Sequence, residues 1–344
     1  KACSNLKNII EGKKWHAEIV LKGLERDMLI EHMLVNLYTT CGFLVDAREV
    51  FDKLPLQVIV SWNILLARYV EQGYCEEAFD CLSEMQCNGI SPDAVSFLCS
   101  LKACSSIGAI DKGIEMHTQI VREGLHEKYS SIANALVDMY AKCGELEKAQ
   151  AVFDDLPFHD MVSWNALIVG YAEQNHITEV LKLFSRMPLE GALPDSVTYI
   201  TILRVFGDFA MNRVQELHMK ISEMGFLDRD PFIGNTLVDT YANCRLLLEA
   251  QEVFDMLPIR DTISWNALIG GYVKHEFAEE ALDCFKEMQI EGVCQDGITF
   301  IYALKACGIS QALDEGQEIH RQIAKSGLLK SEILVGNALV DMYA

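Results

Sequence analysis

Internal repetition is the feature of this sequence that most limits what the chain can fold into. The phrase Ser-Trp-Asn occurs at residues 61–63, 163–165 and 264–266. The run Asn-Ala-Leu-Val-Asp-Met-Tyr at 134–140 returns, with two changes, at 235–241. A unit of about 101 residues therefore occurs a little over three times. Fixed periods of this kind predict a stack of small units that bury their apolar faces against their neighbours.

Each large unit divides into three smaller repeats. Gly-x-x-x-Asp endings separate a standard repeat of 35 residues, a long repeat of 35 or 36 and a short repeat of 31. We expect one continuous array over residues 1–344, with nine complete and two partial repeats. The long repeats are 1–27 (partial), 94–129, 196–230 and 297–332. The short repeats are 28–58, 130–160, 231–261 and 333–344 (partial). The standard repeats are 59–93, 161–195 and 262–296.

The pattern within a repeat predicts helix, turn, helix. In repeat 130–160, Leu136, Tyr140 and Cys143 share one helical face, and Gly144 ends that helix. A second stretch with helical spacing follows and stops before Pro157. Neither helix can bury its apolar stripe alone, so neighbouring hairpins must stack. We expect an all-α solenoid of about twenty helices and no strands.

Composition and charge exclude several classes of protein. The chain has 29 Lys and Arg against 50 Asp and Glu, a net charge of −21, unlike a strongly basic nucleic-acid clamp. No apolar run reaches the ~20 residues of a membrane span, so we expect no membrane partner. The twelve cysteines contain no Cys-x-x-Cys pair, so the commonest zinc and redox spacings are absent. We expect no metal and no cofactor.

Three motifs carry a family resemblance. "VSWNALIVGYAEQ", "LKACSSIGAIDKGIEMHTQIV" and "NALVDMYAKCGELEKAQAVFDDLP" resemble the motifs of the pentatricopeptide repeat family. Their lengths and order are similar to the plant-type PLS subclass of standard, long and short motifs. The long repeat 196–230 departs most, because Arg204-Val205-Phe206 replaces Lys-Ala-Cys and Val214 replaces a glycine.

The resemblance implies a fold and a function. It implies a right-handed superhelical α-solenoid that binds single-stranded RNA, one base per repeat. Such a protein acts as a specificity factor rather than an enzyme in organellar RNA metabolism, above all C-to-U editing, in a mitochondrion or chloroplast. It also implies small helper proteins on the long repeats and a deaminase-like domain after the repeats or in a partner. The chain shows no leader and stops within a repeat, so we expect a fragment without its transit peptide and C-terminal domain.

The resemblance also implies which residues select the base. In the family these are the fifth and last residues of a repeat, and an Asn/Asp pair favours uracil, then cytosine. Repeat 28–58 has His32/Val58, which matches no known pairing, and the partial last repeat offers Asn337 alone. The expected target is N-U-N-U-U-N-U-U-N-Y. The five predicted pairs are Asn63/Asp93, Asn134/Asp160, Asn165/Asp195, Asn235/Asp261 and Asn266/Asp296.

Other positions in the repeats follow from the same resemblance. The second residue of each repeat is expected to sandwich the base, and polar Ser131 is the exception among these. The long repeats have apolar fifth residues, Leu98, Ile200 and Ile301, which cannot read a base edge, so we expect them to be unspecific spacers. The expected sandwiching residues are Val60, Val95, Val162, Val197, Phe232, Ile263 and Ile298.

Simpler explanations stand beside these predictions. An Asp before a helix is a common N-cap, and capping can be a second role of the same Asp residues. The recurrent Trp, Met and His residues are expected to be core, because the histidines lie three repeats apart and cannot share a metal. His16-Ala17-Glu18 lacks the Pro-Cys-x-x-Cys of a zinc deaminase. The alternative function is a protein-binding scaffold in an organellar ribonucleoprotein or ribosome, which the acidity favours.

Overall fold

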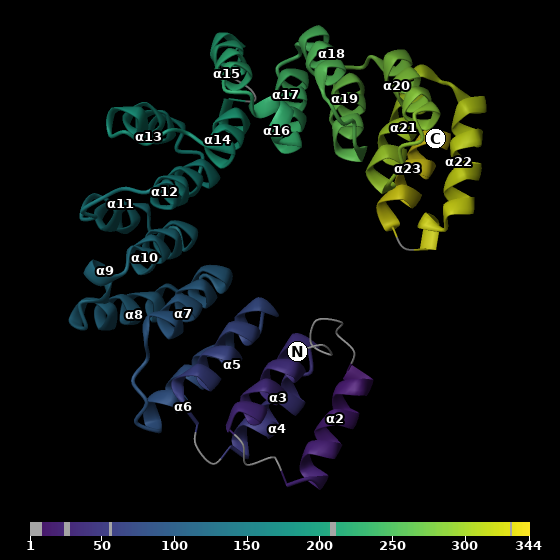
Figure 1. Ribbon diagram of the computed structural model, residues 1–344. Coiled ribbons are helices and arrows are strands. Elements are labelled where there is room, and N and C mark those ends of the chain that lie inside the picture. The colour runs from purple at the N-terminus through teal and green to yellow at the C-terminus, as the bar shows by residue number, and fades with distance from the viewer. Residues whose placement is uncertain (1–8, 24–27, 55–56, 207–210, 331) are drawn as a thin grey trace. The chain divides into compact units, whose positions relative to one another are not determined.

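The computed structural model describes residues 9–23, 28–54, 57–206, 211–330 and 332–344 (Figure 1). Every regular element in these residues is a helix, which confirms the prediction of an all-α solenoid. Part of the predicted repeat 1–27 lies outside the described residues. The chain forms two compact units, residues 1–174 and 175–344, and each is described by itself.

The helices of the first unit follow one another in pairs along the chain (Figure 1). They are α2 (Ile9–Leu21), α3 (Met28–Thr40), α4 (Leu44–Asp52), α5 (Ile59–Glu71), α6 (Cys75–Cys87), α7 (Ala94–Ile107), α8 (Ile110–Arg122), α9 (Leu125–Lys128), α10 (Ser130–Lys142), α11 (Leu146–Asp154) and α12 (Met161–Glu173).

The second unit repeats the arrangement. Its helices are α13 (Ile177–Leu189), α14 (Ser196–Phe206), α15 (Met211–Glu223), α16 (Phe226–Arg229), α17 (Pro231–Asn243), α18 (Leu247–Met256), α19 (Thr262–Lys274), α20 (Ala278–Ile290), α21 (Gly297–Ser310), α22 (Leu313–Ser326), the 3-10 helix η2 (Leu328–Lys330) and α23 (Ile333–Tyr343).

The helices of each unit form two rows. The first helix of each repeat packs on the first helix of the next: α5 on α7, α7 on α10 and α10 on α12 in one unit, and α17 on α19 and α19 on α21 in the other. Each second helix, such as α6 or α20, packs on its own partner and on the next first helix. The repeats 94–129 and 196–230 add a single helical turn, α9 and α16, which the helix-turn-helix prediction did not include.

Local sequence explains where these helices begin and end. Asp93, Asp160, Asp261 and Asp296 are the N-caps of α7, α12, α19 and α21, and each carboxylate accepts a backbone N–H of the first turn. At the end of α10, Gly144 turns the chain with φ 89°, in the left-handed region that glycine adopts at little cost. The first helices thus begin at the residues where the predicted repeats start, and the division into repeats remains an interpretation of the sequence.

The core lies between consecutive repeats. Trp62, Trp164 and Trp265 are at most 1 % exposed. Each meets a phenylalanine of the preceding repeat edge to face, with ring centroids 4.5–4.7 Å apart. Met85 and Met288 are also fully buried. The prediction that these residues form the core rather than stack on bases is confirmed for the tryptophans and methionines.

The recurrent histidines join each long repeat to the short repeat that follows. His16, His117, His218 and His320 lie on α2, α8, α15 and α22. Nδ1 of each lies 2.8–3.1 Å from a tyrosine hydroxyl on the next first helix. The described residues contain no group of three or more His, Cys, Asp or Glu side chains placed to hold a metal. The histidines are therefore packing residues, as expected.

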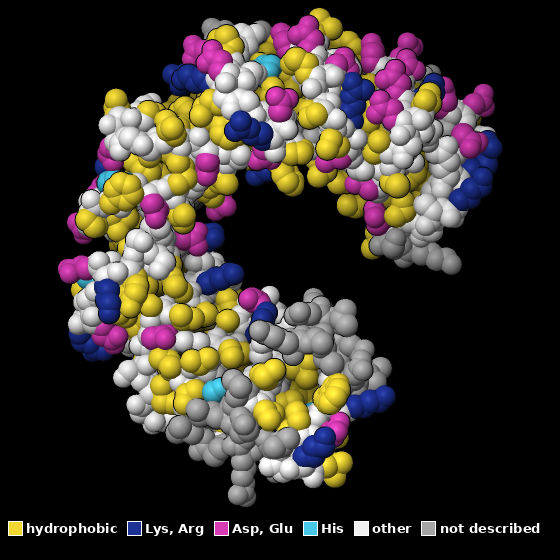
Figure 2. Space-filling model, in the orientation of Figure 1, with side chains coloured by type: hydrophobic (Ala, Val, Ile, Leu, Met, Phe, Trp, Pro, Cys, Tyr) yellow, Lys and Arg dark blue, Asp and Glu magenta, His cyan; other side chains and the backbone are white. Residues whose placement is uncertain are grey.

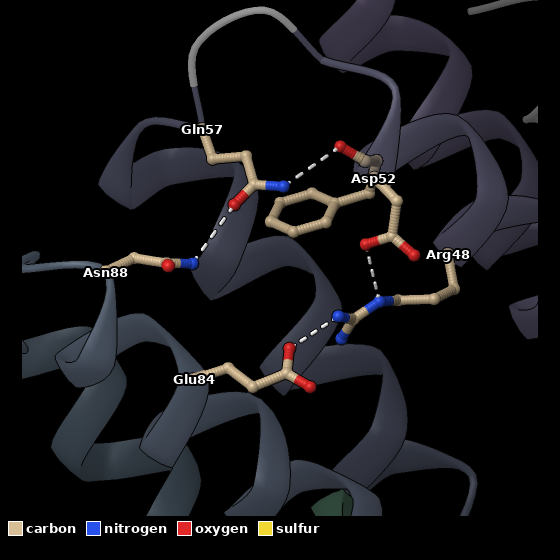
Figure 3. A network of polar contacts seen from close by, with 6 residues as sticks. Arg48, Asp52, Gln57, Glu84 and Asn88 are labelled. Atoms are coloured by element: carbon tan, nitrogen blue, oxygen red, sulfur yellow. Dashed lines mark hydrogen bonds and ion pairs between the residues drawn. The ribbon is translucent and has the colours of Figure 1, made fainter.

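Polar side chains link neighbouring helices in the row of second helices, here called the outer row. Arg48 on α4 donates to Asp52 on its own helix, at 2.8 Å, and to Glu84 on α6 (Figure 3). Asn88, which follows α6, donates to the Gln57 side chain at 3.5 Å. Exposed ion pairs of this kind contribute about 0–1 kcal/mol each, so this network adds little to the stability of the stack.

One junction packs differently from its siblings. A methyl group at Gly113 would come within 2.5 Å of the Met139 sulfur, and one at Gly316 within 2.6 Å of the Met342 sulfur. In repeat 196–230 the glycine is replaced by Val214, and the methionine of the next repeat by Thr240. Both are buried, at 0 % and 2 % exposure. A larger side chain on α15 is thus matched by a smaller one on α17.

Candidate functional site

Asn and Asp side chains from consecutive repeats are hydrogen-bonded to one another. The Asn lies in the first turns of a first helix, and the Asp is the N-cap of the next first helix. Asn63 Nδ2 donates to Asp93 Oδ1 at 3.0 Å, and Asn266 Nδ2 to Asp296 Oδ1 at 3.0 Å. The structure therefore brings these predicted partners together although 30 residues separate them in the chain.

The short repeats make the same contact over 26 residues. Asn134 Nδ2 lies 2.9 and 2.8 Å from the two carboxylate oxygens of Asp160. Asn235 Nδ2 donates to Asp261 Oδ1 at 3.2 Å. The fifth pair, Asn165 and Asp195, has one member in each unit, so its geometry is not described and it stays a prediction. Asn337 is exposed on α23.

The same Asp carboxylate caps a helix and accepts a hydrogen bond from the paired Asn. Asp93 Oδ1 accepts the backbone N–H groups of Val95 and Ser96, each at 3.0 Å, as well as the Asn63 amide. An ionised carboxylate only accepts, so the Asn must turn its NH₂ toward it. The second N–H of the Asn63 amide therefore remains for another partner, while its oxygen accepts from Ser96 Oγ at 2.6 Å. The capping role and the pairing role are compatible.

Hydrogen bonds favour the charged form of two of these carboxylates. Burial raises the pKa of Asp93, but hydrogen bonds from the Ser96 backbone and the Asn63 amide outweigh it and lower the pKa overall. Asp296 behaves alike, with burial opposed by Thr299 and Asn266, and its pKa is lowered. Both side chains are therefore ionised at neutral pH and hold the amides in a fixed direction.

Large apolar side chains stand exposed on the first helices. The residues predicted to sandwich bases are 48–64 % exposed, whereas the tryptophans two residues further along are buried. A soluble protein rarely exposes large apolar side chains at a regular spacing without a partner for them. Leu334, at the same place in the last partial repeat, is 68 % exposed and was missing from the prediction. The exposed residues of the series are Val60, Val95, Val162, Val197, Phe232, Ile263 and Ile298.

In the second unit these residues line one groove of about 750 Å³. Its walls contain Asn235, Asn266 and Asp296 from the pairs, and Phe232, Ile263 and Ile298 from the apolar series. The groove therefore combines amide and carboxylate groups with apolar side chains, which suits a planar ligand that has polar edges.

Positive charges line the same groove. They are Arg204 on α14, Lys274 on α19 and Lys305 on α21. Lys274 Nζ donates to Asn243 Oδ1 at 2.8 Å. Arg204 and Lys305 are exposed, and neither forms an ion pair with another described residue. Burial raises the pKa of the nearby Asp239, and the charges of Lys274 and Arg204 oppose that rise.

These cations were not predicted, although the sequence carried a signal for two of them, Arg204 and Lys305. Lys102, Arg204 and Lys305 are each the ninth residue of a long repeat. An alignment of the long repeats at this position would have found them. The predicted spacers Leu98, Ile200 and Ile301 are partly buried on the same helices.

Repeat 28–58 lacks the paired arrangement. Val58 caps α5 without a side-chain hydrogen bond, and Nε2 of His32 is buried and has no partner among the described residues. The absence of an Asn/Asp pair in the sequence of this repeat therefore corresponds to the absence of a hydrogen-bonded pair there.

The comparisons with known proteins agree with this architecture. Residues 57–106 and 159–208 match the model of the PPR repeat family, and 131–159 and 263–293 match the PPR repeat model. The chain belongs to the pentatricopeptide repeat family. It is 34 % identical over its whole length to the pentatricopeptide repeat-containing protein At4g39530 of Arabidopsis thaliana and covers 41 % of that protein.

Two further Arabidopsis relatives carry organelle names. The chain is 33 % identical to the mitochondrial At3g09040 and 31 % identical to the chloroplastic At1g11290, over 99 % of its own length. It covers 33 % and 42 % of these pentatricopeptide repeat proteins, so it spans less than half of the relatives it matches here.

Solved structures share the fold. The crystal structure of maize PPR10 superposes with a TM-score of 0.68, and PPR10 in complex with an 18-nt psaJ RNA element with 0.72. Sequence identity is 18 %, over 95 % of this chain and 47–48 % of PPR10. In the described residues of this pentatricopeptide repeat chain, no helix has the length and apolar character needed to cross a bilayer.

Proposed function

We propose that this chain binds single-stranded RNA sequence-specifically, one base per repeat. The observation that carries the proposal is the coincidence of two series on the same first helices. One series consists of Asn side chains held by the Asp of the next repeat. The other consists of exposed apolar residues three positions earlier, which are Val60, Phe232 and Ile263; before Asn134 this place is taken by Ser131. Together they offer each base a polar edge contact and an apolar face contact.

The polar groups of a pair suit uracil. With its NH₂ anchored on Asp, the Asn amide keeps one free N–H, and its oxygen has two acceptor sites, of which the following repeat uses at most one. Uracil presents a ring N–H donor flanked by carbonyl acceptors, so it can meet both. Cytosine reverses this order and is second, and purines are too large for the same reach. We propose the target N-U-N-U-U-N-U-U-N-Y, read 5′ to 3′ from repeat 28–58.

The relatives support a proposal for the biological setting. PPR10 is described in complex with RNA, and two similar proteins are named mitochondrial and chloroplastic. We propose that the protein is a PLS-type specificity factor in an organelle and that it acts in C-to-U RNA editing. Catalysis would reside in a deaminase-like domain outside this chain or in a partner protein. Small helper proteins would bind the long repeats.

Net charge favours the alternative, a protein-binding scaffold. At −21 the chain repels polyphosphate overall, and Asp and Glu are spread over the face of the molecule that Figure 2 shows. The groove differs locally from this average, because Arg204, Lys274 and Lys305 lie beside the Asn/Asp pairs. Local charge at the site governs binding more than the net charge of the outer surface does.

Fluorescence anisotropy tests the proposal. The chain is titrated with AUAUUAUUAU and with an RNA in which guanine replaces the uracils at positions 2, 4, 5, 7 and 8, at one salt concentration. We expect at least tenfold tighter binding of the first RNA, which corresponds to about 1.4 kcal/mol. Equal affinity for both RNAs, or no binding of either, would overturn RNA recognition in favour of the scaffold.

A pair of variants locates the site. Asn266→Ala should reduce the preference for uracil over guanine at position 8. Asn88→Ala removes an asparagine of the outer row, which contacts Gln57, and should leave the preference unchanged.

A further inference from the structure

The Asn/Asp pairs fall into two classes, which differ in the group that one neighbouring hydroxyl contacts. The third residue of each following repeat is Ser or Thr, and all four of these residues in the described pairs are fully buried: Ser96, Ser163, Ser264 and Thr299. After a standard repeat the hydroxyl contacts the Asn. After a short repeat it does not.

In the standard repeats the Asn amide is held at both ends. Ser96 Oγ donates to Asn63 Oδ1 at 2.6 Å, while Asn63 Nδ2 donates to Asp93 at 3.0 Å. Thr299 Oγ1 donates to Asn266 Oδ1 at 2.7 Å, while Asn266 Nδ2 donates to Asp296 at 3.0 Å. The same hydroxyls lie 3.1 and 2.8 Å from the carboxylate oxygens, so each pair and its hydroxyl form a closed cluster.

In the short repeats the hydroxyl turns away. Ser163 Oγ donates to the backbone carbonyl of Asp160, and Ser264 Oγ to that of Asp261, both at 2.8 Å. Asn235 is only 5 % exposed, and its Oδ1 has no hydrogen-bond partner among the described residues. The amide is therefore anchored through its NH₂ group alone.

The difference bears on which pyrimidine is accepted. To serve cytosine instead of uracil, the amide must exchange its acceptor and donor positions by rotation about its last side-chain bond. In both classes this rotation breaks the hydrogen bond to Asp. In the standard repeats it also breaks the hydrogen bond from Ser96 or Thr299, because an NH₂ group cannot accept.

We propose that Ser96 and Thr299 are positioning residues that hold the amides of Asn63 and Asn266 in the orientation that selects uracil. This inference rests on the proposed RNA-binding function. The standard repeats 59–93 and 262–296 then discriminate uracil from cytosine, and the short repeats 130–160 and 231–261 accept both pyrimidines. Thr198 holds the corresponding place after Asn165 in the sequence.

The test compares uracil with cytosine at single positions of AUAUUAUUAU by anisotropy. In the parent chain, replacement of uracil by cytosine should weaken binding about fivefold more at positions 2 and 8 than at 4 and 7, the size of one ordinary hydrogen bond. Because both RNAs are titrated against one preparation, the ratio of affinities is independent of the fraction of protein that is folded.

Six variants identify the hydroxyl as the cause. S96A and T299A should lower the uracil-to-cytosine ratio at positions 2 and 8 to the value at 4 and 7, and should keep the preference for uracil over guanine. S96T and T299S retain a hydroxyl and should retain the ratio. S163A and S264A, which remove equally buried hydroxyls, should leave the ratios at positions 4 and 7 unchanged.

The outcomes separate this inference from the function on which it rests. Equal uracil-to-cytosine ratios at all four positions, or an unchanged ratio at position 8 in T299A, would overturn the inference alone. A parent chain without preference for uracil over guanine would overturn the proposed function, and the inference with it.

Discussion

The hydroxyl of Tyr140 lies 2.8 Å from Nδ1 of His117, and the two rings meet edge to face at 5.5 Å. The contact joins the second helix of a long repeat to the first helix of the short repeat that follows. His218 and Tyr241 form the same contact at 3.0 Å. Because of these His–Tyr contacts, we expect the packing between these repeats to depend on the protonation of the histidines.

We expect stability to fall as the pH drops from 7.5 to 5.5. Burial lowers the pKa of His117 below its usual 6.5, with a smaller contribution from the charge of His126, and burial lowers the pKa of His218. The unfolded chain therefore takes up protons before the folded chain does, so stability is complete above pH 6.5 and is lost toward the lower folded pKa. Melting temperatures across this range measure the loss. In H117Q/H218Q the slope should flatten, and an unchanged slope would contradict the assignment.

The Val214/Thr240 junction predicts a compensating pair of substitutions. V214G removes a fully buried side chain and adds a helical glycine, so it should destabilise the chain by about 2–4 kcal/mol. T240M alone overfills the junction and should cost about 1–3 kcal/mol. The double variant recreates the Gly/Met combination of the sibling junctions. In urea unfolding, the double variant should lose less free energy of unfolding than the two single variants lose together. A loss equal to that sum would contradict the packing argument.

The groove cations predict a change in salt dependence. R204A and K305A should each weaken RNA binding by a similar factor for matched and mismatched sequences, because phosphates carry no base identity. Each should also reduce the slope of log K against log salt by about 0.7. Anisotropy at several salt concentrations measures both quantities. K53A, which changes a lysine outside the groove, is the control of equal charge. A variant with altered base preference and an unchanged slope would refute phosphate contact.

The exposed apolar series predicts loss of binding without loss of stability. Phe232 is 64 % exposed on α17, so F232S should change the free energy of unfolding by at most about 0.5 kcal/mol. If the ring packs on a base, RNA affinity should fall by about 1–3 kcal/mol. Circular dichroism and anisotropy on the same sample separate the two effects. Unaltered affinity would show that the ring takes no part in binding.

The repeated phrases predict the helices and the core well, because the helical period of apolar residues is a local property. Trp62 and Met85 are buried as that period requires. The one-turn helix α9 was missed, since four residues are too short to show a period. The pairing of His117 with Tyr140 was also missed, because two core positions on different helices give no signal of a shared hydrogen bond.

The hydroxyl contacts lie beyond what the sequence can show. Ser96 and Ser163 both stand three residues after an Asp and both look like ordinary capping residues. They differ only in the direction of one hydrogen bond, to Asn63 Oδ1 in one case and to the Asp160 carbonyl in the other. That direction depends on how closely two neighbouring repeats pack, which three-dimensional structure alone provides.

The hydrogen bond from Asn63 to Asp93, with the hydroxyl of Ser96 against the same amide, draws its parts from two repeats. The predicted repeat boundary at 93/94 thus runs through the proposed recognition element. If repeats were exchanged between such proteins at this boundary, Asp93 would be separated from Ser96. The third residue of the following repeat would then come from the other protein. A recombination point between the third and fifth residues of a repeat, such as Ser96 and Leu98, would transfer each element intact. The unit that carries the proposed specificity is thus displaced by three residues from the predicted repeat.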